Sequence, residues 1–195
     1  VKQTMLVKEM FFNKKIFLIF LFISYNDVAL SSIKKNIINN LKNTNNLSFN
    51  FEQNINGKVE TGNCIIEYPK KIFCEYDKSN NKILVSNGKS LVIKTKNGNY
   101  YRYAIKKTPL NYILDKNFLI NQIQYLDERV VDNKFINFTI FKDENEINVF
   151  FDIKSYNLIG WQTIDIYQNL NITYLISLKK NQILKKNIFK LPLLN

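Results

Sequence analysis

Short segments in which apolar and polar residues alternate, separated by tight-turn signals, occupy most of this chain. In one of them Leu47, Phe49 and Phe51 alternate with polar residues, which is the period of a half-buried β-strand. Asn87-Gly88 ends a later segment, and Asn-Gly is the strongest short hairpin signal because both residues accept a positive φ. The sequence therefore predicts an antiparallel β-meander.

Two stretches with a helical period interrupt the predicted strands. Strands are expected at about 47–52, 59–67, 71–76, 82–87, 90–95, 99–106, 134–141, 146–152, 158–166 and 171–178. One helix is expected from Ser31 or Ser32 to about Asn43, and a second over about 109–119. Their apolar faces carry Ile33, Ile37, Ile38 and Leu41 in the first helix, and Leu110, Ile113 and Leu114 in the second.

A strongly curved sheet of this size must fill its concave face or leave a cavity there. The two helices are available to cover that opening as a lid over an apolar interior. The expected fold class is therefore mainly β (α+β), with one domain over 32–195. The purely structural alternative is that the same residues form an ordinary helix-on-sheet core without a pocket.

The first 31 residues have the pattern of a secretory signal peptide. Lys14-Lys15 precede the unbroken apolar run Ile16–Ile23, which is too short to span a bilayer, and Ala29-Leu30-Ser31 fits the small-x-small cleavage rule. We expect export and a mature chain that starts at Ser32, with Met10 as the better start codon. A buried helix of the fold is the alternative.

Composition excludes several classes of enzyme and binding protein. The chain has no histidine, which rules out Ser-His-Asp and Cys-His nucleophile arrangements and imidazole metal sites, and its two cysteines cannot form a closed zinc site alone. The net charge is +12, but only Arg102 and Arg129 are arginines, and specific nucleic-acid recognition favours arginine. We expect no cofactor, no metal and no nucleic-acid partner.

Several motifs, in order and spacing over about 31–178, resemble the outer-membrane lipoprotein carrier family, LolA. The similar stretches are Phe49-Asn50-Phe51-Glu52-Gln53, Tyr68-Pro69-Lys70-Lys71-Ile72-Phe73-Cys74-Glu75-Tyr76, Ile83-Leu84-Val85-Ser86-Asn87-Gly88-Lys89, Thr108-Pro109-Leu110, and Trp161 to Asp165 followed by Asn171-Ile172-Thr173. The resemblance implies an incomplete β-barrel with a helical lid over an apolar cavity.

The same resemblance implies a carrier function in which no covalent bond is made or broken. A member of this family is expected to be a periplasmic chaperone that takes acylated lipoproteins from an inner-membrane lipoprotein-releasing ABC transporter. It would deliver them toward the outer membrane, where an acceptor lipoprotein is a further expected partner, and would act as a monomer. The arginine that ties the lid to the barrel in the family is Tyr68 here, which could keep one hydrogen bond to a lid carbonyl.

Residues 62–76 form a predicted hairpin that selects candidate site residues. If Pro69 centres the turn, Ile66, Ile72, Cys64, Cys74 and Tyr76 share one face. The expected cavity residues are Phe49, Phe51, Ile66, Ile72, Cys74, Tyr76 and Leu84, and the expected lid residues are Ile33, Ile37, Leu41, Leu110, Ile113 and Leu114. Cys64 and Cys74 would be opposite one another, either as a disulfide or as two free thiols.

Two rival functions stay open at this point. One is a periplasmic lipid-binding or envelope-sensing domain with the same fold and a different cargo, since fold alone does not decide function. The other is an exported hydrolase that uses paired carboxylates drawn from Glu52, Glu60, Glu67, Glu75 and Asp77. On the predicted faces Glu67 and Glu75 point away from the cavity, which argues against the hydrolase.

Overall fold

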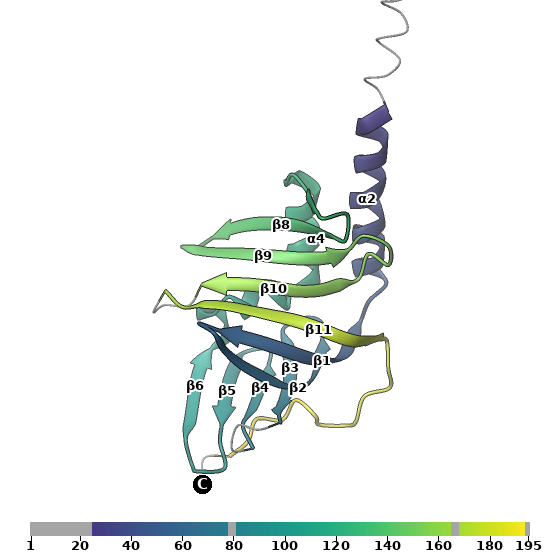
Figure 1. Cartoon of the computed structure of the whole chain (residues 1–195). Helices are drawn as coiled ribbons and strands as arrows, with labels where there is room; N and C mark the ends of the chain where they lie inside the picture. The colour runs from purple at the N-terminus through teal and green to yellow at the C-terminus, as the bar shows by residue number, and fades with distance from the viewer. Residues whose placement is uncertain (1–24, 78–80, 165–167, 194–195) are drawn as a thin grey trace, which may run out of the picture.

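The structure is a computed structural model that describes residues 25–77, 81–164 and 168–193. Its described residues form one antiparallel sheet in the order β6-β5-β4-β3-β2-β1-β11-β10-β9-β8-β7 (Figure 1). The strands are β1 (Asn46–Ile55), β2 (Lys58–Glu67), β3 (Lys71–Tyr76), β4 (Ile83–Asn87), β5 (Ser90–Lys94), β6 (Tyr100–Ala104), β7 (Arg129–Val131), β8 (Phe135–Lys142), β9 (Asn145–Asp152), β10 (Leu158–Ile164) and β11 (Leu170–Lys180).

The pairing of the first strand with the last one joins two meanders into this single sheet. β1 lies between β2 and β11, so that strands β2–β6 extend on one side and β10–β7 on the other. Within the described ranges β6 and β7 each have one neighbour only, and the sheet is therefore open. Figure 1 shows its strong curvature, with β4–β6 turned away from the plane of β8–β10.

The helices lie on one face of the sheet, behind the strands in Figure 1. They are α2 (Tyr25–Lys42), the 3-10 helix η1 (Ile105–Lys107), α3 (Leu110–Ile113) and α4 (Lys116–Tyr125), and α2 packs against α4. Of the helices in the described part of the chain, none combines the length and the apolar character needed to cross a bilayer.

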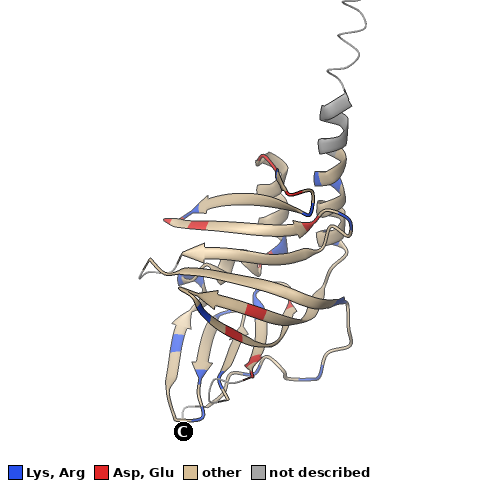
Figure 2. Cartoon of the chain, in the orientation of Figure 1, with Lys and Arg blue, Asp and Glu red and all other residues tan. Residues whose placement is uncertain are grey.

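The hydrophobic core lies between these helices and the inner face of the sheet. Alternate residues of β8 and β9, such as Ile136, Phe138 and Val149, are fully buried there, together with Ile37 of α2 and Ile123 of α4. The strands alternate because successive side chains of a strand point to opposite faces, so one face can be apolar and the other polar. Figure 2 shows that the positions of Lys, Arg, Asp and Glu are dispersed over the strands and turns.

The structure confirms the mainly β fold class and places a strand at each predicted range. The strand expected over 99–106 ends at Ala104, because the next residues form η1, and the helices are also corrected. The expected helix over 109–119 is two helices, because Asp115 starts α4 as its N-cap and accepts a hydrogen bond from the Phe118 N–H at 3.1 Å. The first helix begins at Tyr25 rather than at Ser31 or Ser32. Strand β7 was not predicted, because a three-residue, largely exposed strand carries no alternation. Residues 1–24 of the segment 1–31 that was expected to be a signal peptide lie outside the described residues, and the rest of that segment begins α2.

We predict that Gly62→Ala destabilises the fold strongly. Gly62 is buried in β2, and a Cβ built there would lie 2.0 Å from the Glu75 carbonyl oxygen and 2.8 Å from the Phe51 ring. Because backbone must move to make room, the free energy of unfolding should fall by about 3 kcal/mol in urea denaturation. Gly98→Asn is the control: it lies in an open turn at positive φ, which Asn accepts, and should change stability little.

Candidate functional site

A cavity of about 210 Å³ lies between the inner face of the sheet and the short helix α3. Strands β1 to β5 and β10 to β11 form its walls, and the segment 108–113 lies over it. Its lining residues are Phe51, Gln53, Cys64, Ile72, Cys74, Tyr76, Leu84, Leu91, Ile93, Thr108, Pro109, Leu110, Ile113, Trp161, Thr163, Asn171 and Thr173. The lining is therefore mainly apolar, with a minority of amide and hydroxyl groups.

The β2–β3 hairpin places one apolar wall of this cavity. In its register Gly62 is opposite Tyr76, Cys64 is opposite Cys74, and Ile66 is opposite Ile72, as the turn at Pro69 predicts. A disulfide joins Cys64 and Cys74, whose Cα atoms are 4.1 Å apart. The cross-link fixes two neighbouring strands at the cavity wall, so the register of the hairpin cannot slip there.

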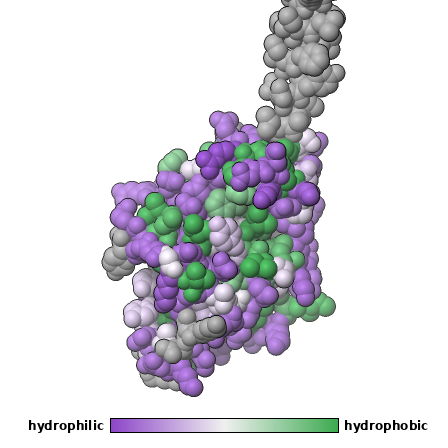
Figure 3. Space-filling view, viewed as in Figure 1, coloured by the Kyte–Doolittle hydropathy of each residue, from purple (hydrophilic) through white to green (hydrophobic). Residues whose placement is uncertain are grey.

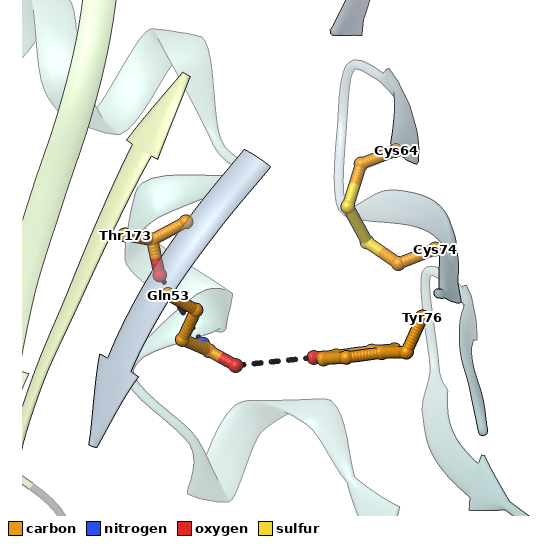
Figure 4. The surroundings of a disulfide bond; sticks show 5 residues. All are labelled: Gln53, Cys64, Cys74, Tyr76 and Thr173. Atoms are coloured by element: carbon orange, nitrogen blue, oxygen red, sulfur yellow. Dashed lines mark hydrogen bonds between the residues drawn. A yellow bond between two sulfur atoms is a disulfide. The ribbon is translucent and has the colours of Figure 1, made fainter. Parts of the chain in front are cut away.

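A network of polar side chains around Gln53, here called the polar end, also lines the cavity, and Figure 4 shows Gln53 with Tyr76 and Thr173. The amide nitrogen of Gln53 donates to Asn171 Oδ1 at 3.1 Å and to Thr173 Oγ1 at 3.2 Å, and the Tyr76 hydroxyl donates to Gln53 Oε1 at 3.2 Å. Burial, followed by the nearby charge of Glu60, raises the pKa of Tyr76, so its hydroxyl stays protonated and remains a donor. The cavity thus runs from an apolar wall to a polar end.

Helix α3 is the part of the lid that contacts the cavity. Pro109 precedes its first turn, and the Thr108 hydroxyl donates to the Ile105 carbonyl at 2.9 Å, which fixes the entry of the chain. Leu110 and Ile113 point into the cavity lining, whereas Leu114 is fully buried beside it in the core. A four-residue helix has few internal hydrogen bonds, so its position depends on its neighbours.

Lys70, at the tip of the β2–β3 hairpin, ties that hairpin to the lid. Its backbone N–H donates to the Leu114 carbonyl at 2.7 Å, and its Nζ lies 3.4 Å from Asp115 Oδ2. The Lys70 carbonyl in turn accepts from the Ser86 hydroxyl at 2.8 Å. The ion pair is partly exposed and therefore weak, while the backbone hydrogen bond sets the geometry.

In the described part of the chain, the structure does not contain the hydrogen bond that was expected between Tyr68 and a lid carbonyl. The Tyr68 hydroxyl is buried but has no hydrogen-bond partner among the described residues, and burial raises its pKa. The tie to the lid comes instead from Lys70, two positions further along the hairpin. A turn residue at positive φ directs its N–H and its side chain toward the lid, which the residue pattern alone did not indicate.

A second tie holds the other side of α3. The Tyr112 hydroxyl donates to Asp143 Oδ2, in the turn between β8 and β9. This hydrogen bond raises the pKa of Tyr112 and lowers the pKa of Asp143, because it favours the ionised carboxylate. Polar contacts from both halves of the sheet thus hold the short lid helix, two through Lys70 and one through Asp143.

The predicted site residues separate into two groups. Five of the seven expected cavity residues line the cavity, and Phe49 and Ile66 are buried in the adjoining core. Of the expected lid residues Leu110 and Ile113 line it, while Ile37, Leu41 and Leu114 are core and Ile33 is partly buried against the core. Helix α2 therefore supports the core rather than lining this cavity.

The sequence did not indicate which residues of β1, β10 and β11 line the cavity. Gln53 was quoted only as part of a motif, and Asn171 and Thr173 are polar residues on the inner face of strands. Trp161 packs edge-on against Phe49, with ring centroids 6.5 Å apart. Alternation in β10 and β11 would have placed Trp161 and Thr173 on one face, but it could not show which face is inner.

A comparison with protein families matches most of the chain. A family model described as "Outer membrane lipoprotein carrier protein LolA" matches residues 42–192. No curated protein sequence matches the chain significantly.

Solved structures resemble the chain only distantly. A LolA superfamily protein from Nitrosomonas europaea has 6% identity and a TM-score of 0.44, covering 83% of this chain and 97% of that one. An uncharacterised conserved protein from Thermus thermophilus has 6% identity and a TM-score of 0.49, covering 84% and 94%. The MucA/MucB complex of Pseudomonas aeruginosa has 9% identity and a TM-score of 0.47, covering 84% and 61%. At these values the family match, and not the solved structures, assigns the chain.

We predict that Tyr112→Phe raises the pKa of Asp143 toward its ordinary value of 3.8, because the carboxylate loses the donor that favours its ionised form. The lowered pKa means that this tie contributes above pH 3.8 and is lost as the pH falls through the lower value. NMR titration of the side-chain carboxyl carbons measures the Asp143 pKa in the parent and in the variant. Asp152, whose pKa Ser155 lowers, is the internal control and should not change. An unchanged Asp143 pKa would contradict the tie.

Proposed function

The chain belongs to the outer membrane lipoprotein carrier family, LolA, and from this premise we propose that it is a periplasmic chaperone for lipoproteins. It binds the acyl chains of lipoproteins released from the inner membrane and delivers them toward the outer membrane. The observation that carries the proposal is the apolar cavity under a lid held by few polar contacts. No bond is made or broken in this function, so catalytic residues and cofactors have no role in it.

The energy of burying an acyl chain accounts for the apolar wall. Each methylene moved out of water contributes about 0.8 kcal/mol, so a chain of about 14 methylenes gains on the order of 11 kcal/mol. Ile72, Leu84, Leu91 and Ile93 provide a surface for it on β3 to β5. The polar end at Gln53 suits the ester and amide groups that link acyl chains to a lipoprotein.

The cavity must enlarge to accept such cargo. Its 210 Å³ is below the range of about 300–1,000 Å³ that small-molecule sites occupy. The lid can move because Leu110 and Ile113 belong to a four-residue helix, and because the Lys70–Asp115 ion pair and the Tyr112–Asp143 hydrogen bond that tie it to the sheet are only partly buried. Opening exchanges these polar contacts and the apolar packing of Ile113 for apolar contact with the cargo.

The expected partners follow from the same role. An inner-membrane lipoprotein-releasing ABC transporter supplies the cargo, and an acceptor lipoprotein at the outer membrane receives it. The carrier acts as a monomer in the periplasm, where the Cys64–Cys74 disulfide is compatible with the oxidising conditions.

We predict that Leu84→Trp weakens binding of a triacylated lipopeptide at least tenfold. Leu84 is partly exposed and lines the cavity, so a larger ring occupies the space of the acyl chain without burying a new group in the core. Ile83→Trp is the matched control, because Ile83 is the preceding residue on the opposite face of β4, and binding should be unchanged. Native mass spectrometry with the lipopeptide and its deacylated counterpart measures both.

Three outcomes of this experiment decide between the functions. One-to-one binding of only the acylated peptide, lost in Leu84→Trp, supports the carrier. Binding that is equal in Leu84→Trp and Ile83→Trp contradicts the cavity as the acyl site. No binding of either peptide rejects this cargo, and favours a lipid-binding or envelope-sensing domain of the same fold.

A further inference from the structure

A chain of hydrogen-bonded polar side chains lies on the outer face of β8 and β9, on the opposite side of the sheet from the lid. Asn148 donates from its amide nitrogen to Glu146 Oε1 at 3.1 Å. The Thr139 hydroxyl donates to Asn148 Oδ1 at 2.6 Å, and the amide nitrogen of Asn137 donates to the same oxygen at 3.2 Å. That nitrogen also lies 3.4 Å from Thr139 Oγ1.

The carboxylate of Glu146 fixes the direction of this chain. A carboxylate only accepts, so the amide nitrogen of Asn148 must face it, and the amide oxygen of Asn148 must face Thr139 and Asn137. Asn137 must then use its nitrogen toward Asn148. Its own Oδ1 is left as a buried acceptor that no described residue supplies with a donor.

This orphaned oxygen is unusual because of its burial. Asn137 is only 4% exposed and Asn148 8% exposed, although both lie on the outer face of an antiparallel sheet, where polar side chains are normally solvated. A buried acceptor without a donor is costly, and buried polar groups are nearly always paired. A donor supplied by a ligand would satisfy this acceptor.

Asn137 and Asn148 lie in a groove with a volume of about 510 Å³, which is within the usual range for a small-molecule site. Register places the groove residues next to one another, since Asn148 is opposite Thr139 in β8 and Gln162 in β10. Asn137 is opposite Phe150 in β9 and Arg129 in β7. Figure 3 views this outer face, where hydrophilic and hydrophobic residues are interspersed.

Phe150 gives the groove an aromatic wall. It is opposite Gly160, and a Cβ at that position would lie 3.3 Å from Phe150 Cδ2. The ring therefore lies across the neighbouring strand where the glycine leaves room. Phe135 packs edge-on against it, with ring centroids 5.6 Å apart, and holds it in place.

The charges at the groove exclude some ligand classes. Arg129 lies there with Asp127 and Glu146, so the formal charge of the groove residues is −1 although the chain as a whole carries +12. That balance does not favour a phosphate or another anion. The polar lining also distinguishes the groove from the apolar cavity under the lid.

We propose that this groove is a saccharide-binding site. A sugar hydroxyl or acetamido N–H donates to Asn137 Oδ1, the Gln162 amide contacts a neighbouring polar group of the sugar, and the apolar face of the sugar ring packs on Phe150. The site is separate from the acyl cavity and does not depend on the carrier function. Through this site the protein can bind a glycan whether or not its cavity holds an acyl chain.

The test uses NMR of the purified, ¹⁵N-labelled protein with two sugars at millimolar concentration. N,N′-diacetylchitobiose carries hydroxyl and acetamido donors, and cellobiose has the same linkage but only hydroxyl donors. We expect the side-chain amide signals of Asn137, Asn148 and Gln162 to shift on titration. Shifts with both sugars assign the donor as a hydroxyl, and shifts with the first alone assign it as the acetamido N–H; either supports the site.

Variants locate the binding. Asn137→Leu and Gln162→Leu should each weaken binding about tenfold, because each removes a hydrogen-bonding group at the site. Asn63→Leu, at an exposed outer-face position on β2, is the matched control and should bind as the parent does. If Asn137→Leu does not fold, Gln162→Leu alone decides. No shift with either sugar, or binding unchanged in the folded variants, overturns the proposal.

Discussion

The register of the β2–β3 hairpin is the constraint on which the rest of the site depends. Side chains of a strand alternate between faces, so a shift of β3 by one residue would turn Ile72, Cys74 and Tyr76 away from the cavity. The disulfide between Cys64 and Cys74 and the close approach of Gly62 to the Glu75 backbone both require the observed register. The same register puts Lys70 at the tip, where its N–H reaches the Leu114 carbonyl of the lid.

Apolar burial and polar contacts contribute differently to the core and to the lid. Apolar burial stabilises the core between α2, α4 and β8 to β10, and it is strong because those side chains are fully enclosed. The lid over the cavity is held by the burial of Ile113 and Leu114, and also by the Lys70–Leu114 and Tyr112–Asp143 hydrogen bonds and the Lys70–Asp115 ion pair. The polar contacts can be exchanged with water at small net cost, and the apolar contacts of the lid can be replaced by contacts with the cargo, so the lid can open while the core stays folded.

The sequence predicted much of the sheet because alternation and turn residues are local signals. Asn87-Gly88 and the period of Phe49 and Phe51 were sufficient to predict their strands and the turn between β4 and β5. The break at Asp115 was missed because its capping role depends on a hydrogen bond rather than on apolar spacing. The pairing of β1 with β11 is long-range, and no local pattern specifies it.

The site residues that local patterns specify were predicted correctly, and those that depend on tertiary geometry were not. Ile72, Cys74 and Tyr76 could be placed in the cavity from one hairpin, whereas the family position of Tyr68 led to the wrong contact. Lys70 replaced it because the geometry of a turn, which residue types alone do not specify, decides which N–H meets the lid. The lining role of Trp161 and Thr173 required knowledge of which face of β10 and β11 is inner.

Hydrogen exchange at the Lys70 backbone amide tests most directly whether the cavity opens by moving its lid. This N–H is bonded to the Leu114 carbonyl, so its exchange reports separation of the hairpin from the lid, whereas the Ile72 N–H inside β3 reports the sheet. A saturating triacylated lipopeptide should make the Lys70 amide exchange faster and leave the Ile72 amide unchanged. Binding of the lipopeptide with equal or slower exchange at Lys70 would contradict the account.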